Sequence, residues 1–163
     1  MKFQIKDLRN LQEELDARIF TLHHVSRDST RDDRCLALLV EISELANETR
    51  CFKYWSQRAP SAKEVLLEEL EDSIHFLLSL GIDLKDETEI IESAKSEAKL
   101  NELFLAWYAS AVKLHQEFTL ENFRACFGIA VLIGQKLNFT NEELRAFYLL
   151  KNQKNHQRQD TNY

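Results

Sequence analysis

Two apolar stretches, LALLVEISELANETRCF at residues 36–52 and EVLLEELEDSIHFLLSL at residues 64–80, decide the fold class of this chain. In both stretches apolar residues recur every three or four positions, which is the spacing of one face of an α-helix. The single proline, Pro60, stands between them and favours the start of a new helix. We therefore expect antiparallel helices, the first over about residues 32–55 and the second ending at Gly81.

The remainder of the chain carries the same helical periodicity. One face of a first helix is lined by Leu8, Leu11, Leu15, Ile19 and Leu22. Residues 86–117 indicate one long helix or two collinear ones. Thr119 is expected to cap a fifth helix, and Thr140 with Glu143 forms a capping box for a sixth.

These elements predict an all-α fold, a helical bundle of about five to six helices. Only 3 glycines and 1 proline occur among 163 residues, which disfavours a β fold with many turns. We expect a single domain over residues 1–163, in which residues 151–163 form a polar tail.

Composition and charge exclude several function classes. The net charge of −6 disfavours a protein that follows a nucleic-acid backbone, because such a chain repels phosphates at long range. No run approaches the roughly 20 apolar residues that a membrane span needs. Residues 1–16 are charged throughout and lack an apolar signal core. The 3 cysteines lack CxxC spacing, and we interpret them as reduced thiols of a cytoplasmic protein.

Four carboxylates form two pairs on the two deciding helices: Glu41 with Glu44, and Glu69 with Asp72. Residues three apart lie on the same side of a helix, and both pairs fall at the margin of an apolar face. Clustered carboxylates near a core repel one another and lose hydration unless a cation neutralises them. Oxygen ligands alone favour a hard cation, Mg²⁺ or Mn²⁺ as a substitute.

Two other interpretations of these carboxylates remain open at this point. Pairs of glutamates on helices are most often a solvated face. A di-iron bundle also buries carboxylates, but it requires two Glu-x-x-His pairs. Only Asp72-x-x-His75 resembles such a pair, and no matching histidine follows Glu44.

The spacing of the two pairs resembles the signature of the all-α NTP pyrophosphatase superfamily, which is related to MazG. Further segments resemble the dimeric, all-α dUTPases within it. These segments are LQEELDARI (11–19), ELANETRCFKYWS (44–56), LEELEDSIHFLLSLG (67–81) and YLLKNQKNHQRQDTNY (148–163). The resemblance implies a homodimer that hydrolyses dUTP, and also dUDP, to dUMP. It implies that Glu41, Glu44, Glu69 and Asp72 ligate magnesium and that Glu44 also orients the attacking water.

The resemblance also assigns the residues that bind the nucleotide. Around the uracil and deoxyribose it implies Gln12 and Asp16, with apolar contacts near the base from Trp55 and Phe76. The phosphates would be bound by Lys151, Asn155, Arg158 and Tyr163. Glutamine offers both a donor and an acceptor to an imide edge, and cationic side chains pair with phosphate oxygens.

Two alternatives to a dUTPase are consistent with the residues. One is a MazG-like nucleoside triphosphate pyrophosphatase of other or broader specificity, which shares the four carboxylates but not the uracil pocket. The other is a non-enzymatic helical interaction protein whose acidic faces are solvated. On that second interpretation, Lys151, Asn155 and Arg158 are a basic helix end favoured by the helix dipole.

Overall fold

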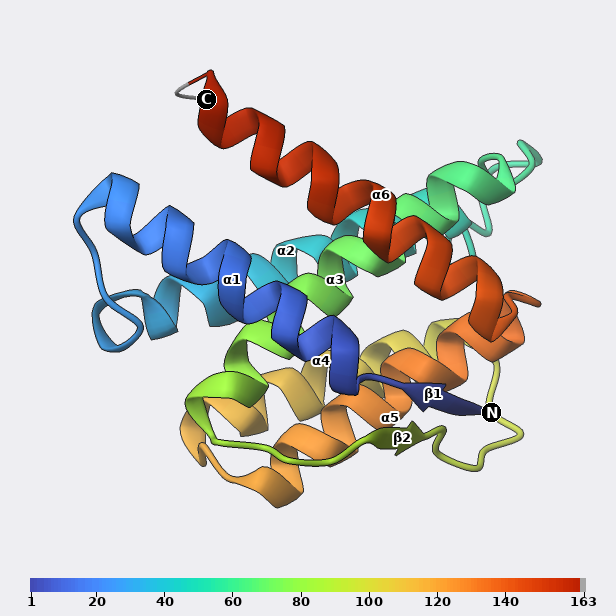
Figure 1. The fold of residues 1–163 in the computed structure, drawn as a ribbon. Helices are drawn as coiled ribbons and strands as arrows, with labels where there is room; N and C mark the ends of the chain where they lie inside the picture. Colours follow the sequence, from blue (N-terminus) through green and yellow to red (C-terminus); the bar gives the residue numbers. More distant parts are fainter. Residues whose placement is uncertain (162–163) are drawn as a thin grey trace.

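The structure is a computed structural model that describes residues 1–161. Within this range the chain forms six α-helices and one small antiparallel sheet (Figure 1). The helices are α1 (Lys6–His23), α2 (Arg31–Thr49), α3 (Lys63–Asp83), α4 (Leu100–Gln116), α5 (Leu120–Lys136) and α6 (Asn141–Asp160). The strands are β1 (Lys2–Gln4) and β2 (Ile90–Glu92), and a 3-10 turn spans Asp28–Thr30. The predicted all-α bundle is confirmed.

Helix α3 is the central element of the bundle. It packs against α1, α2, α5 and α6, and Figure 1 shows α1 and α6 crossing in front of it. Leu70, Ile74 and Leu77 of this helix are buried, because apolar residues at spacings of three and four form a stripe that faces the core. This packing fixes the position of α3 and therefore of its polar side chains Glu69 and Asp72.

The connection between α2 and α3 differs from the sequence prediction. Helix α2 ends at Thr49, since Arg50 adopts a left-handed conformation with φ of 56° and its backbone N–H caps the helix. Pro60 lies in the connection, ahead of Ala62 at the N-cap of α3, and is not in the first helical turn. The predicted end near residue 55 was wrong because the aromatic residues after Thr49 continue the apolar pattern without being helical.

Gly81 does not end α3, which continues to Asp83. A Cβ atom at Gly81 would lie 2.6 Å from the Cζ atom of the Phe123 ring on α5. The glycine therefore allows α3 and α5 to approach closely, and it does not form a C-terminal turn.

The segment before α4 was predicted to be helical but is extended. Strand β2 pairs with β1, so that Phe3 lies opposite Ile91, and both side chains are buried. The backbone N–H of Ile5 donates to the carbonyl of Glu89 at 2.9 Å and prolongs the contact. Adjacent isoleucines fit a strand with one buried face, but the run is too short for its period to be recognised.

The two predicted N-caps are confirmed. The Thr119 hydroxyl accepts from the backbone N–H of Asn122 at 3.3 Å, and Thr140 forms a capping box with Glu143. Helix α6 then runs to Asp160, so most of the predicted polar tail is helical. No helix in residues 1–161 is long and apolar enough to cross a membrane.

Candidate active site

A cleft of about 840 Å³ opens between α1, α2, α3 and α6. Ten of the twelve predicted site residues line this cleft: Gln12, Asp16, Glu41, Glu44, Glu69, Asp72, Phe76, Lys151, Asn155 and Arg158. Four helices that are distant in the sequence thus bring most of the predicted set together.

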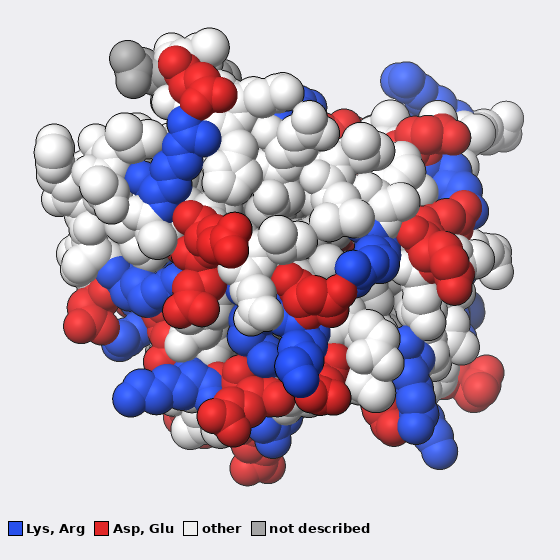
Figure 2. All heavy atoms as spheres, viewed as in Figure 1, with Lys and Arg blue, Asp and Glu red and all other residues white. Residues whose placement is uncertain are grey.

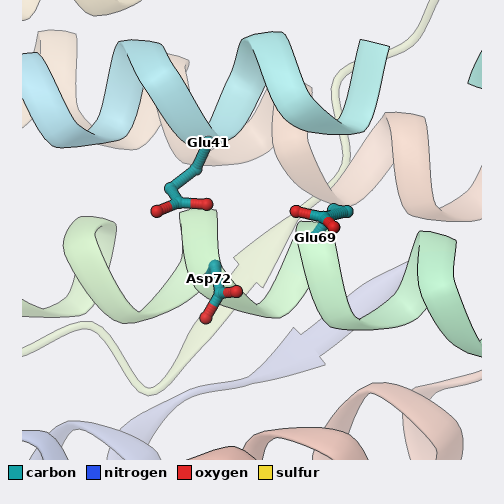
Figure 3. Close-up of side chains that lie close together, drawn as sticks. All are labelled: Glu41, Glu69 and Asp72. Atoms are coloured by element: carbon teal, nitrogen blue, oxygen red, sulfur yellow. The ribbon is translucent and has the colours of Figure 1, made fainter. Parts of the chain in front are cut away.

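Three of the predicted carboxylates form a compact acidic cluster. Glu41 projects from α2 toward Glu69 and Asp72 on α3 (Figure 3). One oxygen atom from each side chain lies within 4.8 Å of the corresponding atoms of the other two. Glu69 and Asp72 share a face of α3 because they are three residues apart, and the antiparallel packing of α2 places Glu41 opposite them.

The electrostatics of this cluster are unfavourable to bare carboxylates. Burial, followed by repulsion from Asp72, Glu44 and Glu69, raises the pKa of Glu41 to about 7. Burial, followed by repulsion from Glu44 and Asp72, also raises the pKa of Glu69 to about 7. The pKa of Asp72 is raised by burial, although its hydrogen bond from Lys151 opposes the shift. The cluster is therefore short of positive charge.

The donor set fits a hard divalent cation. All of the ligating atoms are carboxylate oxygens, half-buried and close enough together to share one ion, which are the conditions that Mg²⁺ and Mn²⁺ require. Glu44 is exposed and lies outside the group of three, but its charge contributes to the raised pKa of both Glu41 and Glu69. It lines the cleft beside the cluster.

Helix α6 supplies a basic face to the cleft. The Lys151 ammonium contacts Asp72 at 2.7 Å and Glu68 at 3.0 Å. Burial lowers the pKa of Lys151, but hydrogen bonds and ion pairs with these two carboxylates outweigh it and raise the pKa overall. The Arg158 guanidinium donates to the Asn155 side-chain oxygen at 3.3 Å, one turn further along the same face. Tyr163, also predicted to bind phosphate, lies outside the described residues.

At the other end of the cleft Gln12 and Asp16 are buried and bonded to each other. The Gln12 Nε2 group donates to the Asp16 Oδ1 atom at 2.7 Å. The Asp16 Oδ2 atom accepts from the Ser79 hydroxyl at 2.6 Å and pairs with Arg27 at 3.1 Å. Burial raises the pKa of Asp16, while these donors act in the opposite direction. The carboxylate is thus fixed by protein donors within the wall of the cleft.

The orientation of the Gln12 amide is fixed by two further side chains. Its Oε1 atom accepts from the Tyr148 hydroxyl at 3.0 Å and lies 2.7 Å from the His75 Nδ1 atom. His75 stacks on Tyr148, and burial lowers its pKa to about 3, so the imidazole is neutral. A neutral histidine with Nδ1 protonated completes this arrangement. Helices α1, α3 and α6 are joined by these contacts.

The two predicted aromatic residues occupy different places. Phe76 is half-buried and lines the cleft. Trp55 lies on the connection between α2 and α3, is 65% exposed, and packs edge-to-face against Tyr54. Within one chain it therefore does not wall the cleft, and its contact with the base stays a prediction.

Several residues of the cleft were not predicted from the sequence, among them Glu68 and Ser79. Glu68 holds Lys151. Its position one helical turn before Asp72 could have revealed it, because residues at i and i+4 share a face. Ser79, which fixes Asp16, carried no recognisable signal, since a serine in an apolar helix is unremarkable until its partner is known.

The structure defines an all-α protein whose cleft combines a candidate metal site with a basic face. The particular family follows from sequence comparison. The family model described as dUTPase matches residues 4–163, and the chain belongs to this family of dUTP diphosphatases. A search of curated proteins finds no match. Membership in an enzyme family sets aside the non-enzymatic alternative.

Proposed function

We propose that this chain is a cytoplasmic, Mg²⁺-dependent enzyme that hydrolyses dUTP to dUMP and pyrophosphate, and dUDP to dUMP and phosphate. Mn²⁺ is expected to substitute for Mg²⁺. The family supports dUTP as the substrate. The observation that carries the metal dependence is the convergence of Glu41, Glu69 and Asp72, whose charges Lys151 and Arg158 offset only in part.

In this proposal Glu41, Glu69 and Asp72 hold the cation, and Glu44 orients the attacking water. Bound Mg²⁺ would neutralise phosphate oxygens and lower the pKa of a coordinated water. Glu44 suits the role of water acceptor because it is exposed at the cleft beside the cluster and is not itself among the three converging carboxylates. A carboxylate in that position accepts a proton from water within hydrogen-bond reach.

The uracil and deoxyribose are proposed to bind where Gln12, Asp16 and Phe76 line the cleft. The Gln12 amide nitrogen has one described partner, Asp16, and an amide nitrogen carries two N–H groups. The second is available to a uracil carbonyl. The half-buried Phe76 ring offers an apolar contact to the base.

The phosphates are proposed to bind along α6, where Lys151, Asn155 and Arg158 line the same cleft as the acidic cluster. Charge-assisted hydrogen bonds from lysine and arginine stabilise the charge that develops on phosphate oxygens. Tyr163 remains part of this proposal on the strength of the family resemblance alone. Figure 2 shows acidic and basic side chains interspersed over the visible face, without a continuous basic tract among the described residues there. This pattern supports a small phosphorylated ligand and not a nucleic-acid backbone.

The homodimer is also a proposal, supported by an exposed apolar face on α2 and α4. Leu36 is 62% exposed and Leu105 is 69% exposed, and Val40 and Val112 extend the same surface. The Tyr108 hydroxyl donates to Ser43 at 2.7 Å and joins α4 to α2 at the surface. Several exposed aliphatic side chains on one face are typical of a protein interface.

Hydrolysis of a nucleotide panel tests the substrate and the metal together. Pyrophosphate release would be measured with dUTP, dCTP, dTTP and dATP, each with MgCl₂ or with excess EDTA. We expect dUTP to be hydrolysed and the activity to vanish in EDTA and return with Mg²⁺ or Mn²⁺. One methyl group in an apolar pocket discriminates by about 1–3 kcal/mol, so dTTP should be at least roughly tenfold slower. Comparable rates with dCTP or dTTP would overturn uracil specificity in favour of a MazG-like enzyme.

A further inference from the structure

One carboxylate of the acidic cluster has two competing uses. Asp72 belongs to the group that can ligate a cation, and it is also 2.7 Å from the Lys151 ammonium. The Lys151 side chain is only 9% exposed, so it is held in the cleft wall and does not sample solvent freely. Without a bound ion, this lysine is the cation that most strongly offsets the charge of Asp72, and Arg158 has a smaller effect.

A divalent ion on the cluster changes the position of that lysine. Asp72 would then bear a second cation close to the ammonium, and two cations on one half-buried carboxylate repel each other strongly. Lys151 must either leave the cleft or find another anion within reach of its flexible stem.

Glu68 is the anion within reach. It lies 3.0 Å from the ammonium groups of both Lys151 and Lys154, and it lies outside the group of three carboxylates. Helix α3 places Glu68 one turn before Asp72, and the Lys151 ammonium already contacts both carboxylates. The lysine can therefore give up Asp72 and keep Glu68 by side-chain rotation, with no change in backbone. Because Glu68 also lines the cleft, a lysine held there remains among the groups that face the phosphates.

We propose that Lys151 is the internal counter-ion of the metal-free cluster and that Glu68 is the positioning residue that retains it when a cation takes Asp72. This proposal rests on the metal-dependent function proposed above. Of the two carboxylates that Lys151 contacts without metal, only Glu68 is kept when the cation binds, which gives Glu68 a role that a solvated surface glutamate does not have. Metal binding and the presentation of Lys151 to the phosphates are thereby coupled.

Metal binding in the absence of nucleotide tests the first half of the proposal. Calorimetric titration with MnCl₂ would compare the wild type with Lys151→Met and with Lys154→Met. The control removes the same charge from a lysine that contacts Glu68 but has no described contact with Asp72. We expect Lys151→Met to bind Mn²⁺ roughly tenfold more tightly, because a neighbouring charge shifts such equilibria by about one logarithmic unit or more. Lys154→Met should stay within about twofold of wild type.

A double-mutant cycle tests the second half. Affinity for the non-hydrolysable α,β-imido analogue of dUTP would be measured with MgCl₂ in Glu68→Gln, Lys151→Met and the double variant. We expect Glu68→Gln to weaken binding several-fold, by roughly the size of a charge-assisted contact, when Lys151 is present. It should have little effect when Lys151 is absent. Melting curves establish that each variant is folded at the assay temperature.

The outcomes separate this proposal from the proposed function. Equal or weaker Mn²⁺ binding by Lys151→Met overturns the counter-ion role, and equal effects of Glu68→Gln in both backgrounds overturn the positioning role. Either result leaves the wild-type activity on dUTP as it was. A wild-type chain that binds no Mn²⁺ overturns the proposed metal dependence and this proposal together.

Discussion

Asp86 and the acidic cluster of the cleft both withdraw carboxylates from solvent, but they differ in how much positive charge surrounds them. Asp86 has a fully buried side chain and accepts from Arg9 at 2.7 Å and from Arg124 at 2.9 Å. The cluster around Glu41 and Glu69, only half-buried, gathers several negative charges that Lys151 and Arg158 offset only in part. The chain supplies arginines where a carboxylate has a structural role, and it leaves the acidic cluster short of positive charge.

This difference separates a carboxylate that stabilises the fold from carboxylates that bind a cation. An aspartate satisfied by arginines gains nothing from an added cation. A cluster with unsatisfied charge costs stability until a cation arrives, and this cost is the reason that it binds one. Substitutions at the two places should therefore have opposite consequences for stability and activity.

The largest effect is expected for Asp86→Ala. The substitution leaves Arg9, whose side chain is 13% exposed, without its carboxylate partner. Breaking a buried pair from one side costs about 3–5 kcal/mol of folding free energy. Urea unfolding measures the loss, and hydrolysis of dUTP per folded molecule should stay within about twofold of wild type. An unchanged unfolding midpoint would contradict the structural role.

Glu69→Gln should have the opposite effect: a large loss of activity with no loss of stability. Loss of groups that only orient a metal ligand costs about 10–100-fold in affinity or activity, so loss of a ligand should cost at least about 100-fold. Stability without metal should stay equal or rise, because one repelling charge is removed from the cluster. Initial rates of dUTP hydrolysis and metal-free melting curves test both statements. Glu64→Gln, on the exposed surface of the same helix, is the matched control.

The pH dependence of stability should distinguish the metal-free chain from the chain with magnesium. The folded pKa of Glu41 and of Glu69 is about 7, above the ordinary glutamate value. Each raised pKa stabilises the fold at low pH, and that contribution is lost as pH rises through about 7. Mg²⁺ requires the ionised forms, so the Mg²⁺-induced increase in melting temperature should grow from pH 6 to pH 8. An increase independent of pH would exclude these two carboxylates as ligands.

The smallest effect is expected at Glu71, which is fully buried beside Asp72. Neither of its carboxyl oxygens has a hydrogen-bond partner among residues 1–161, and burial raises its pKa well above the ordinary value. The fold must therefore hold this acid protonated, which costs increasing free energy as pH rises. Glu71→Gln should raise stability at pH 8 by about 1 kcal/mol, with little change at pH 5. Equal urea midpoints at pH 8 would show that Glu71 is ionised and paired.

The sequence allowed the fold class and most of the cleft to be predicted, because both depend on helical spacing. Glu69 and Asp72 lie three apart on an amphipathic helix, so they share a face of that helix however it packs against its neighbours. The strand at Ile90–Glu92 could not be predicted, since it exists only through its pairing with Lys2–Gln4, more than 80 residues away.

Side-chain contacts between different helices of the cleft could not be predicted from the sequence either. The bond from Tyr148 to Gln12 joins helices at opposite ends of the chain, and no local pattern encodes it, whereas Gln12 and Asp16 lie one turn apart on α1. The resemblance implied that Trp55 lies near the base, but within one chain the structure places it on an exposed connection. Periodicity identifies a face of a helix, whereas the partner of that face depends on the tertiary arrangement.

The central position of α3 has a consequence for how the protein tolerates sequence change. One face of this helix carries Glu69, Asp72 and Phe76, and the others meet α1, α2, α5 and α6. Gly81 at its far end has no room for a methyl group. A saturation mutagenesis screen should therefore show a nearly continuous intolerant block over residues 66–81, interrupted only where side chains reach solvent. Homologous chains should accordingly drift in the connections first and in this helix last.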